Sequence, residues 1–301
     1  MHTMSISLQV SNERRMTRIV PRMAVRVIFY ILPFIFVSCA DNPSGSSALG
    51  ARADAPEDSL AVKVAVTPTL DCLPLFVASE EGMFDAAGIT VRLCMFQAQM
   101  DQDTAFVRKH VEGMTTDSVR ASYLRGHEGV ALRQLAATSL RWQLLANKTA
   151  RIRQLSQLYD KMIAMTRHSA TSHLASKAVA MAGISAEHVF FIQINDLAVR
   201  LGMLENDVMD AMFLPEPQAT QARMSGHNVL LDTDSLDFHP GVLVFREDAL
   251  ADTACLHRIE TLVKVYRQAC DSVEKHGLSH YRNIVSAYCN IRPEVVDSVG
   301  K

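Results

Sequence analysis

The chain has 301 residues, of which 49% are hydrophobic and 21% are charged, a balance typical of a folded globular protein. Its 13 glycines and 10 prolines are too few for a fibrous protein, and the absence of long apolar runs excludes a multi-pass membrane protein. Five of the 30 basic residues and one of the 32 acidic residues lie within residues 1–38, so the remainder has a net charge of −6. That sign disfavours a phosphate backbone as partner, and we expect no nucleic-acid binding.

The N-terminal segment has the layout of an export signal. Arg22 and Arg26 precede an apolar core over 27–37, which is followed by small residues that include Cys39. The position of this cysteine resembles a bacterial lipoprotein box, in which the thiol receives a diacylglyceryl group and becomes the mature N-terminus. We therefore predict a lipoprotein signal peptide over 1–38 and a lipid on Cys39. The alternative is a buried N-terminal hydrophobic helix with an incidental cysteine.

Residues 39–59 have the composition of a linker. They are rich in Ser, Gly, Ala, Asp and Pro and poor in large apolar side chains, so they cannot bury enough surface to offset the entropy of ordering. We predict a flexible tether between the lipid and a folded domain. The resulting location is the bacterial cell envelope, with the folded domain facing the periplasm or the exterior.

From residue 60 onward, short strands and helices alternate. The order of strand, helix and strand over 61–93 predicts a parallel pair with a crossover helix. Helical patterns dominate after Phe106 and are broken at residues 114–117. The further expected elements are strands at 144–146, 162–165, 189–192 and 208–214 and helices at 172–181 and 197–204. Repeated units of this kind predict the α/β class.

Three blocks carry a family resemblance. They are the segments 73–91, 163–171 and 210–217, and the last of them reads Asp-Ala-Met-Phe-Leu-Pro-Glu-Pro. In this order they resemble ABC-transporter solute-binding lipoproteins of the nitrate/sulfonate/taurine and thiamine-pyrimidine-precursor type, over roughly residues 62–222.

The resemblance implies a two-lobed type II periplasmic-binding fold with a ligand cleft between the lobes. Lobe one would comprise residues 60–145 plus 240–301, and lobe two residues 146–239. The implied partners are a small polar organic molecule or anion as ligand, an ABC permease in the inner membrane, and the membrane itself through Cys39. The protein would be a monomer without a cofactor.

Candidate ligand-binding residues lie in loops that follow strands and open helices, where free backbone N–H groups point outward. Hydroxyl and carboxylate side chains there could hold a ligand or could simply cap the helices. Glu216 could accept from a ligand amine or cap a helix from Gln218 onward, and His168 could donate to an anion or face solvent. The candidates are Thr67, Thr69, Asp71, Thr115, Thr116, Asp117, His168, Ser169, Thr171 and Glu216.

Catalytic and metal-binding patterns are not evident. The sequence has no G-x-S-x-G, Walker A or H-E-x-x-H motif and no C-x-x-C pair, and Gly277 weakens the helical spacing of His276 and His280 as metal ligands. We expect no catalytic residues and no metal. An enzyme of the pyrimidine or menaquinone pathway on the same fold, and an exported sensor or scaffold, remain alternatives. If Cys39 is lipidated, an odd number of cysteines remains, most of them expected to be buried as small hydrophobes: Cys72, Cys94, Cys255, Cys270 and Cys289.

Overall fold

The computed structural model describes residues 60–300, and these belong to one compact unit. The predicted signal peptide (1–38), the lipidation site Cys39 and the tether (39–59) lie outside the described residues. Within the described part of the chain, no helix is long and apolar enough to cross a membrane. All five cysteines in this part are free.

The first of two five-stranded sheets has the strand order β2-β1-β3-β10-β4. β1 pairs in parallel with β2 and β3, whereas β10 runs antiparallel to both β3 and β4. The strands are β1 (Val62–Val66), β2 (Val91–Met95), β3 (Gly113–Asp117), β4 (Leu132–Ala137) and β10 (Gly241–Arg246). The central strands β3 and β10 are buried along their whole length, and in β10 this burial accompanies a continuous rather than alternating apolar pattern.

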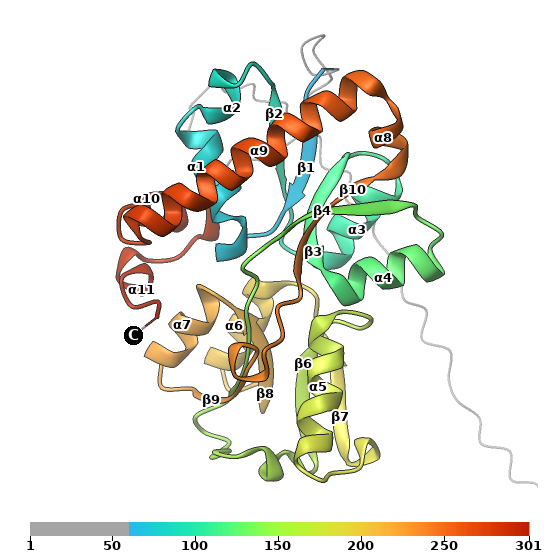
Figure 1. Cartoon of the computed structure of the whole chain (residues 1–301). Helices are drawn as coiled ribbons and strands as arrows, with labels where there is room; N and C mark the ends of the chain where they lie inside the picture. Colours follow the sequence, from blue (N-terminus) through green and yellow to red (C-terminus); the bar gives the residue numbers. More distant parts are fainter. Residues whose placement is uncertain (1–59, 301) are drawn as a thin grey trace, which may run out of the picture. The chain divides into compact units, whose positions relative to one another are not determined.

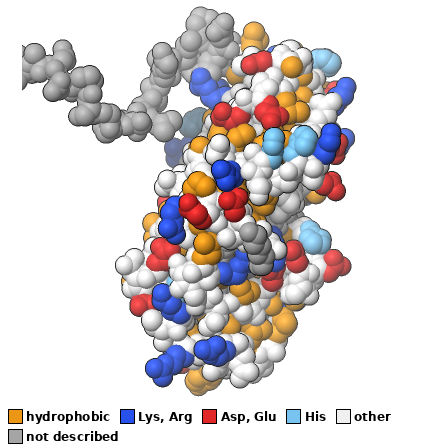
Figure 2. All heavy atoms as spheres, turned by 90° about the vertical axis from the view of Figure 1, so that its left-hand side faces the viewer, with side chains coloured by type: hydrophobic (Ala, Val, Ile, Leu, Met, Phe, Trp, Pro, Cys, Tyr) orange, Lys and Arg blue, Asp and Glu red, His pale blue; other side chains and the backbone are white. Residues whose placement is uncertain are grey.

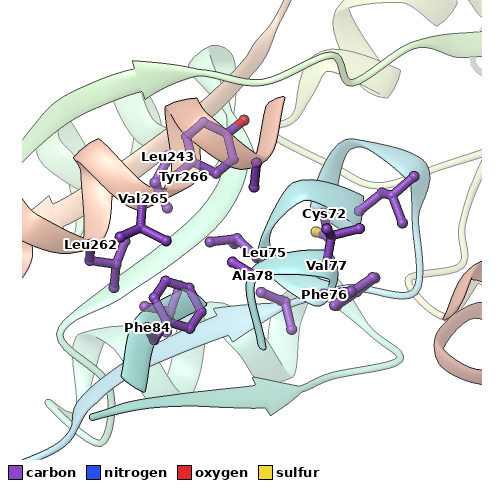
Figure 3. Packing of buried hydrophobic residues seen from close by; sticks show 14 of the residues in the cluster. Cys72, Leu75, Phe76, Val77, Ala78, Phe84, Leu243, Leu262, Val265 and Tyr266 are labelled. Carbon is purple, nitrogen blue, oxygen red and sulfur yellow. The ribbon is translucent and has the colours of Figure 1, made fainter. Parts of the chain in front are cut away.

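Helices pack on the first sheet, and the long helix α9 crosses one face of it (Figure 1). Between α1, α9 and the sheet lies the largest apolar cluster, in which Leu75 and Phe76 of α1 pack with Leu243 of β10 and Tyr266 of α9 (Figure 3). Gly82 separates α1 from α2 with a φ of 64°, a conformation that glycine adopts without steric cost. The helices are α1 (Leu73–Glu80), α2 (Met83–Ala86), α3 (Gln99–Val107), α4 (Ser118–His127), α8 (Glu247–Ala251), α9 (Thr253–His276), α10 (Arg282–Cys289) and α11 (Pro293–Val296).

The second sheet has the order β7-β6-β8-β5-β9, and it too mixes parallel and antiparallel pairs. Its apolar residues form two clusters, one on each face. Its elements are β5 (Trp142–Ala146), β6 (Lys161–Met165), α5 (Ala170–Met181), β7 (Val189–Gln193), α6 (Leu197–Glu205), β8 (Ala211–Pro215), α7 (Gln218–Met224) and β9 (Asn228–Asp232).

The chain passes between the two sheets at two places. Residues 138–141 lead from β4 of the first sheet to β5 of the second, and residues 233–240 lead from β9 back to β10. The second sheet is therefore built from the consecutive strands β5 to β9, whereas the first sheet takes its strand β10 from much later in the sequence.

Most expected elements are present, and the mixed α/β class is confirmed. The parallel pair β1–β2 with its crossover helix is confirmed as well. The prediction that residues 114–117 merely interrupt helices is wrong, because they form β3. The apolar pattern of the sequence does not reveal this strand, because it contains Thr115, Thr116 and Asp117. Its burial is imposed by the neighbouring strands β1 and β10. The one helix expected between the first two strands is divided, because α1 ends at Glu80 and α2 begins at Met83. The sequence analysis does not predict β4, β9 and β10.

Gly113 in β3 provides a test of the first sheet. A Cβ atom at this position would lie 2.5 Å from the ring of Phe245 in β10, its partner in the sheet. Gly113→Ala should therefore lower the free energy of unfolding by about 1–3 kcal/mol, the cost of overpacking a buried site. Chemical denaturation of the full-length chain measures this.

The matched control is Gly202→Ala in α6, where an added Cβ meets nothing within 4 Å. This substitution should leave the protein unchanged or stabilise it by up to ~1 kcal/mol, because alanine favours helix over glycine. Equal losses in the two variants would contradict the packing of β3 against Phe245.

Candidate ligand-binding site

A cavity of about 40 Å³ lies between the two sheets, and both sheets contribute to its wall. The first sheet contributes the loop after β1, the loop after β2 together with α3, and the end of β3. Because these three strands run parallel, their carboxyl ends meet at one edge, where open α/β sheets bind ligands. The residues from this side are Thr67, Thr69, Asp71, Gln97, Gln99, Gln102, Thr115, Thr116 and Asp117.

The second sheet supplies the opposite wall. Its residues come from the first crossing segment and β5, from the end of β6, and from the loop between β7 and α6 together with that helix. They are Leu140, Trp142, Thr166, Asn195, Leu197 and Arg200. The wall thus combines amides and hydroxyls with two carboxylates, one guanidinium and one indole ring, and it contains no histidine, cysteine, serine or lysine side chain.

The structure brings six of the ten predicted site residues to this cavity and leaves four outside its wall. All six come from the first sheet: Thr67, Thr69, Asp71, Thr115, Thr116 and Asp117. The four others are His168, Ser169, Thr171 and Glu216, and each has partners elsewhere. A ligand role for any of the ten stays a prediction.

Ser169 and Thr171 lie outside the cavity wall but contact Thr166, which is part of it. Ser169 is the N-cap of α5 and accepts a hydrogen bond from the Thr171 backbone N–H at 3.2 Å. Its hydroxyl donates to the carbonyl of Thr166 at 2.7 Å, and the Thr171 hydroxyl accepts from the Thr166 N–H at 2.9 Å. These contacts agree with the alternative in which hydroxyl side chains cap a helix. The two residues also hold the backbone of Thr166, which itself lines the cavity.

His168 lies at a contact between helices of the two sheets. Its ring stacks on Tyr123 of α4 with centroids 4.2 Å apart and an angle of 11° between the planes, and Tyr123 also stacks on His127. The His168 side chain is exposed and its φ is 56°. The solvent-facing alternative therefore describes His168 better than an inward-pointing donor does.

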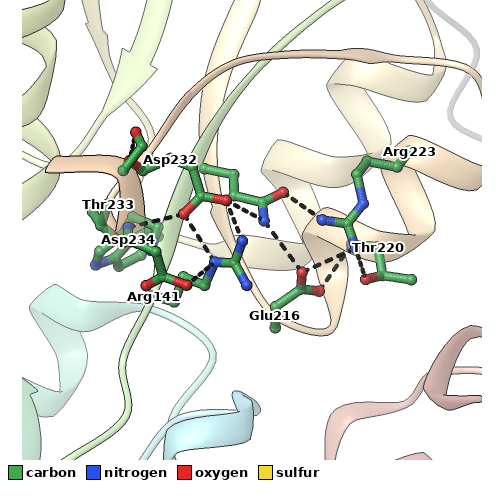
Figure 4. A network of polar contacts seen from close by, with 10 residues as sticks. Arg141, Glu216, Thr220, Arg223, Asp232, Thr233 and Asp234 are labelled. Carbon is green, nitrogen blue, oxygen red and sulfur yellow. Dashed lines mark hydrogen bonds and ion pairs between the residues drawn. The ribbon is translucent and has the colours of Figure 1, made fainter. Parts of the chain in front are cut away.

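Glu216 belongs to a polar network next to the first crossing segment (Figure 4). Its Oε2 accepts from the Thr220 N–H at 3.0 Å, which caps α7, and its Oε1 lies 3.2 Å from the guanidinium of Arg223. Gln143 connects Glu216 to Asp232, which is paired with Arg141. The helix-capping alternative is thus realised, and Glu216 lines a separate cavity of about 220 Å³.

Asp117 joins the two sheets. Its Oδ1 accepts from the Arg120 N–H at 2.7 Å, which caps α4, and from the Ala170 N–H at 2.9 Å, at the first turn of α5. Its Oδ2 accepts from the Gln99 amide at 3.2 Å. Burial raises the pKa of the Asp117 carboxyl, an effect that these three hydrogen bonds partly offset. One carboxylate oxygen therefore occupies the N-termini of two helices, the places where an anion would otherwise bind.

Arg200 was not among the predicted site residues. It is fully buried in α6, and its guanidinium donates to the carbonyls of Ile194 and Phe213 and to the hydroxyl of Thr166, at 2.6–2.8 Å. Burial lowers its pKa to about 9, so the side chain stays protonated at neutral pH. Arg200 has helical spacing with Leu197 and Leu204, which places it on the buried face of α6. A basic residue on an apolar helix face is a sequence signal from which its burial could have been predicted.

The glutamines after β2 were also missed. Gln102 is buried and donates to the carbonyls of Ala65 and Thr115 at 3.1 and 2.6 Å, and Gln99 contacts Asp117. The rule that ligands bind beyond the carboxyl ends of parallel strands applies to β2 as well as to β1, so the rule itself pointed to this loop. No comparable local signal marks Leu140 and Trp142, whose place in the wall depends on the crossing segment.

Among residues 60–300, no three His, Cys, Asp or Glu side chains are grouped so that they could hold a metal ion. His276 and His280 stack with ring centroids 5.1 Å apart. His276 instead lies within 3.3 Å of the hydroxyls of Ser272 and Tyr281.

The family model NMT1/THI5 like matches residues 69–276. The chain belongs to this family. The match runs from the loop after β1 to the end of α9 and includes every residue of the cavity wall except Thr67. No curated protein matches the sequence.

Solved structures share the fold at low sequence identity. The alkanesulfonate-binding protein SsuA from Xanthomonas axonopodis pv. citri, bound to MOPS, matches with a TM-score of 0.70 and 14% identity over 79% of this chain and 82% of that one. The periplasmic nitrate-binding protein NrtA from Synechocystis PCC 6803 matches with a TM-score of 0.70 and 15% identity over 78% and 68%. The desulfurization enzyme DSZB matches with a TM-score of 0.60 and 13% identity over 79% and 83%. These likenesses establish a periplasmic-binding-protein fold.

The double contact of Asp117 can be tested with two substitutions. Asp117→Ala leaves two buried N–H groups without an acceptor and should lower the free energy of unfolding by about 1–3 kcal/mol. Asp117→Asn keeps an acceptor oxygen and should cost less. Denaturation of both variants beside the wild type measures the difference.

The pH dependence of the same variants has a defined sign. Because the folded-state pKa of Asp117 is raised, the unfolded chain loses this proton first as the pH rises, and the wild type loses stability above the ordinary carboxyl pKa. Asp117→Asn removes this loss, so its stability relative to the wild type should increase from acidic to neutral pH. If Asp117→Asn is as unstable as Asp117→Ala at every pH, the two N–H groups require the charge and not merely an acceptor.

Proposed function

We propose that this protein is an extracytoplasmic solute-binding protein that captures a small polar organic molecule or anion for an ABC importer. The observation that carries the proposal is a cavity whose wall is shared by two sheets that the chain connects only through residues 138–141 and 233–240. A ligand in that position touches both sheets, so binding and the approach of the sheets are coupled. The family match and the fold shared with SsuA and NrtA support the same role.

We propose two lobes, lobe one (60–145 plus 240–301) and lobe two (146–239), which correspond to the two sheets except that residues 142–145 of β5 pair in the second sheet. Hydrogen bonds already link these lobes around the cavity. Leu70 donates its N–H to the carbonyl of Glu216 at 2.9 Å, and the Gln218 amide donates to the carbonyl of Pro68 at 2.7 Å. Asp117 accepts from Ala170 on another side. A ligand would enter by breaking such contacts and be enclosed when they form again.

Binding without chemistry fits the side chains of the wall better than catalysis does. Cys72 lies behind the wall, where its thiol is 3.2 Å from the hydroxyl of Thr115, and burial raises its pKa to about 12. A thiol in that environment remains protonated and is a poor nucleophile. The fold is shared with the enzyme DSZB, so this argument rests on the residues and not on the architecture.

One face of the protein shows how its charged side chains are distributed. On the face shown in Figure 2, acidic and basic side chains are interspersed. Such a face offers no continuous positive field to a phosphate backbone.

The site itself is tested with a pair of isosteric substitutions, after a thermal-shift screen of sulfonates, nitrate, taurine and pyrimidines has identified a ligand. Thr116→Val removes a hydroxyl at the cavity wall and should weaken binding about threefold to tenfold, as expected for one neutral hydrogen bond. Ser169→Ala removes a helix cap outside the wall and should lower stability by about 1 kcal/mol without changing affinity. Calorimetric titration and unliganded melting curves measure both. Affinity that is unchanged in Thr116→Val and reduced in Ser169→Ala would place the ligand elsewhere.

We further propose that a lipid on Cys39 anchors the protein, a statement that rests on the sequence alone. Cys39→Ala should release the protein from membranes of its host, because the thiol is the acceptor of the lipid. Fractionation into soluble and membrane pools measures the change, and Cys94→Ala in the folded part serves as control. Membrane association that persists in Cys39→Ala while the control behaves as wild type would contradict the anchor.

A further inference from the structure

Each of the two sheets ends in edge strands, beyond which no further strand follows in the described part of the chain. These edges are β2 and β4 in the first sheet and β7 and β9 in the second (Figure 1). Charged side chains on edge strands discourage pairing with another chain. Three of the edges have one, namely Arg92 in β2, Arg133 in β4 and Asp232 in β9. β7 reads Val-Phe-Phe-Ile-Gln and is the only described edge strand without a charged side chain.

β7 also exposes apolar surface. Its Phe190 is 53% exposed, and Met162, the Cα partner of Phe190 in the neighbouring strand β6, is 36% exposed. Phe191 and Ile192 are half-buried. Aromatic and β-branched residues favour extended strands, so the sequence of β7 is suited to pairing on both sides. An uncharged edge of this composition is a surface to which another strand can add.

The hydrogen bonds at the two ends of β7 show which of its residues direct their backbone groups away from β6. The carbonyl of His188 accepts at 2.7 Å from the residue before β6, and the N–H of Ile194 donates at 3.1 Å to the last residue of β6. Backbone groups alternate in direction along a strand with a period of two. Val189, Phe191 and Gln193 therefore direct their N–H and C=O groups to the open side of the edge.

We propose that β7 pairs antiparallel with β7 of a second copy of this chain, about a two-fold axis at Phe191. Residues that exchange hydrogen bonds lie opposite each other in an antiparallel pair, and this axis places Phe191 opposite Phe191 and Val189 opposite Gln193. Each Phe191 N–H donates to the Phe191 carbonyl of the other copy, and each Gln193 N–H donates to the Val189 carbonyl. The Val189 N–H is not required, because it already donates to the carbonyl of Ala186. The two second sheets then form one continuous sheet.

The side chains of β7 and of the residues beside it fit this arrangement. Phe190 lies opposite Ile192 of the other copy, an aromatic and β-branched pair of the kind that stabilises neighbouring strands. The same axis places Glu187, whose side chain is 76% exposed, opposite Asn195. A carboxylate that accepts hydrogen bonds therefore faces an amide that donates them, and no two like charges lie opposite each other over residues 186–196. This complementarity favours a second copy over another partner, and it departs from the monomer that the family resemblance implies.

Sedimentation velocity of the full-length chain in a non-ionic detergent tests the pairing. Two short edges form a small interface, so we expect monomer and dimer to exchange over about 1–100 µM rather than a permanent dimer. Phe190→Lys places a charge on the edge and removes the exposed ring, and it should raise the Kd of the dimer at least about tenfold. Gln193→Pro removes an outward N–H without removing a hydrogen bond to β6, and it should have a similar effect.

Met224→Lys is the matched control. Met224 is 50% exposed in α7, which packs on β5 and β8 and not on the edge, so the same change of charge there should leave the Kd unchanged. All of these chains retain residues 1–59, so association through that segment would be common to them. Melting curves of each variant establish that it is folded, and Gln193→Pro decides the matter if Phe190→Lys is not.

Three results overturn the inference, and none of them bears on the solute-binding function. The first is a wild-type chain that stays monomeric over the whole concentration range. The second is a dimer whose Kd is unchanged in both folded edge variants. The third is an equal loss of dimer in Met224→Lys, which would assign the effect to added charge and not to the edge.

Discussion

The carboxylate of Asp117 is the constraint on which the arrangement of the two sheets depends. It ends a strand of the first sheet, caps the helix that follows and accepts a backbone N–H from the first turn of α5 on the second sheet. A backbone amide at a helix start is an anion-binding group, and here the protein supplies the anion itself. The residue is 1% exposed, so water does not compete for these bonds. The N-termini of α4 and α5 are therefore both held by the Asp117 carboxyl group, and the cavity lies beside this group.

The titratable groups of the cavity wall are not paired with one another. Arg200 on one side and the carboxyl groups of Asp71 and Asp117 on the other are each bonded mainly to neutral groups, and burial raises the pKa of both carboxyls. By contrast, the network beside the crossing segments contains direct ion pairs of Arg141 with Asp232 and Asp234 and of Arg223 with Glu216 (Figure 4). The pairs of Arg141 with Asp232 and Asp234 join the two crossing segments to each other. They therefore fix the course of the chain where it passes between the sheets.

The apolar core and the cavity wall differ in how completely their groups are satisfied. The apolar cluster beneath α1 and α9 is closely packed and contributes to folding without reference to any ligand (Figure 3). In the cavity wall, by contrast, one polar atom each of Asp71 and Trp142 has no hydrogen-bond partner. Sites that bind tightly often retain such costs, because a group satisfied within the protein is no longer free to recognise a solute.

The sequence by itself determined the α/β class, the parallel β1–β2 unit and the loops of the first sheet that reach the cavity, because these features follow from local hydrophobic periods and from polar residues placed directly after strands. It also indicated the family through short blocks in a fixed order. It could not separate helix caps from ligand contacts, since Ser169 and Thr116 are the same kind of residue and only the surrounding fold makes one a cap and the other part of a wall.

The tertiary structure alone decided the rest. β3 is a strand because β10, more than a hundred residues later in the sequence, pairs with it, and no local pattern contains that information. Arg200 and Trp142 reach the cavity because the chain crosses between the sheets before β5 and returns after β9. Which polar atoms are left without partners depends on every neighbour at once, so the polar character of the cavity wall is decided only when the two sheets lie against each other.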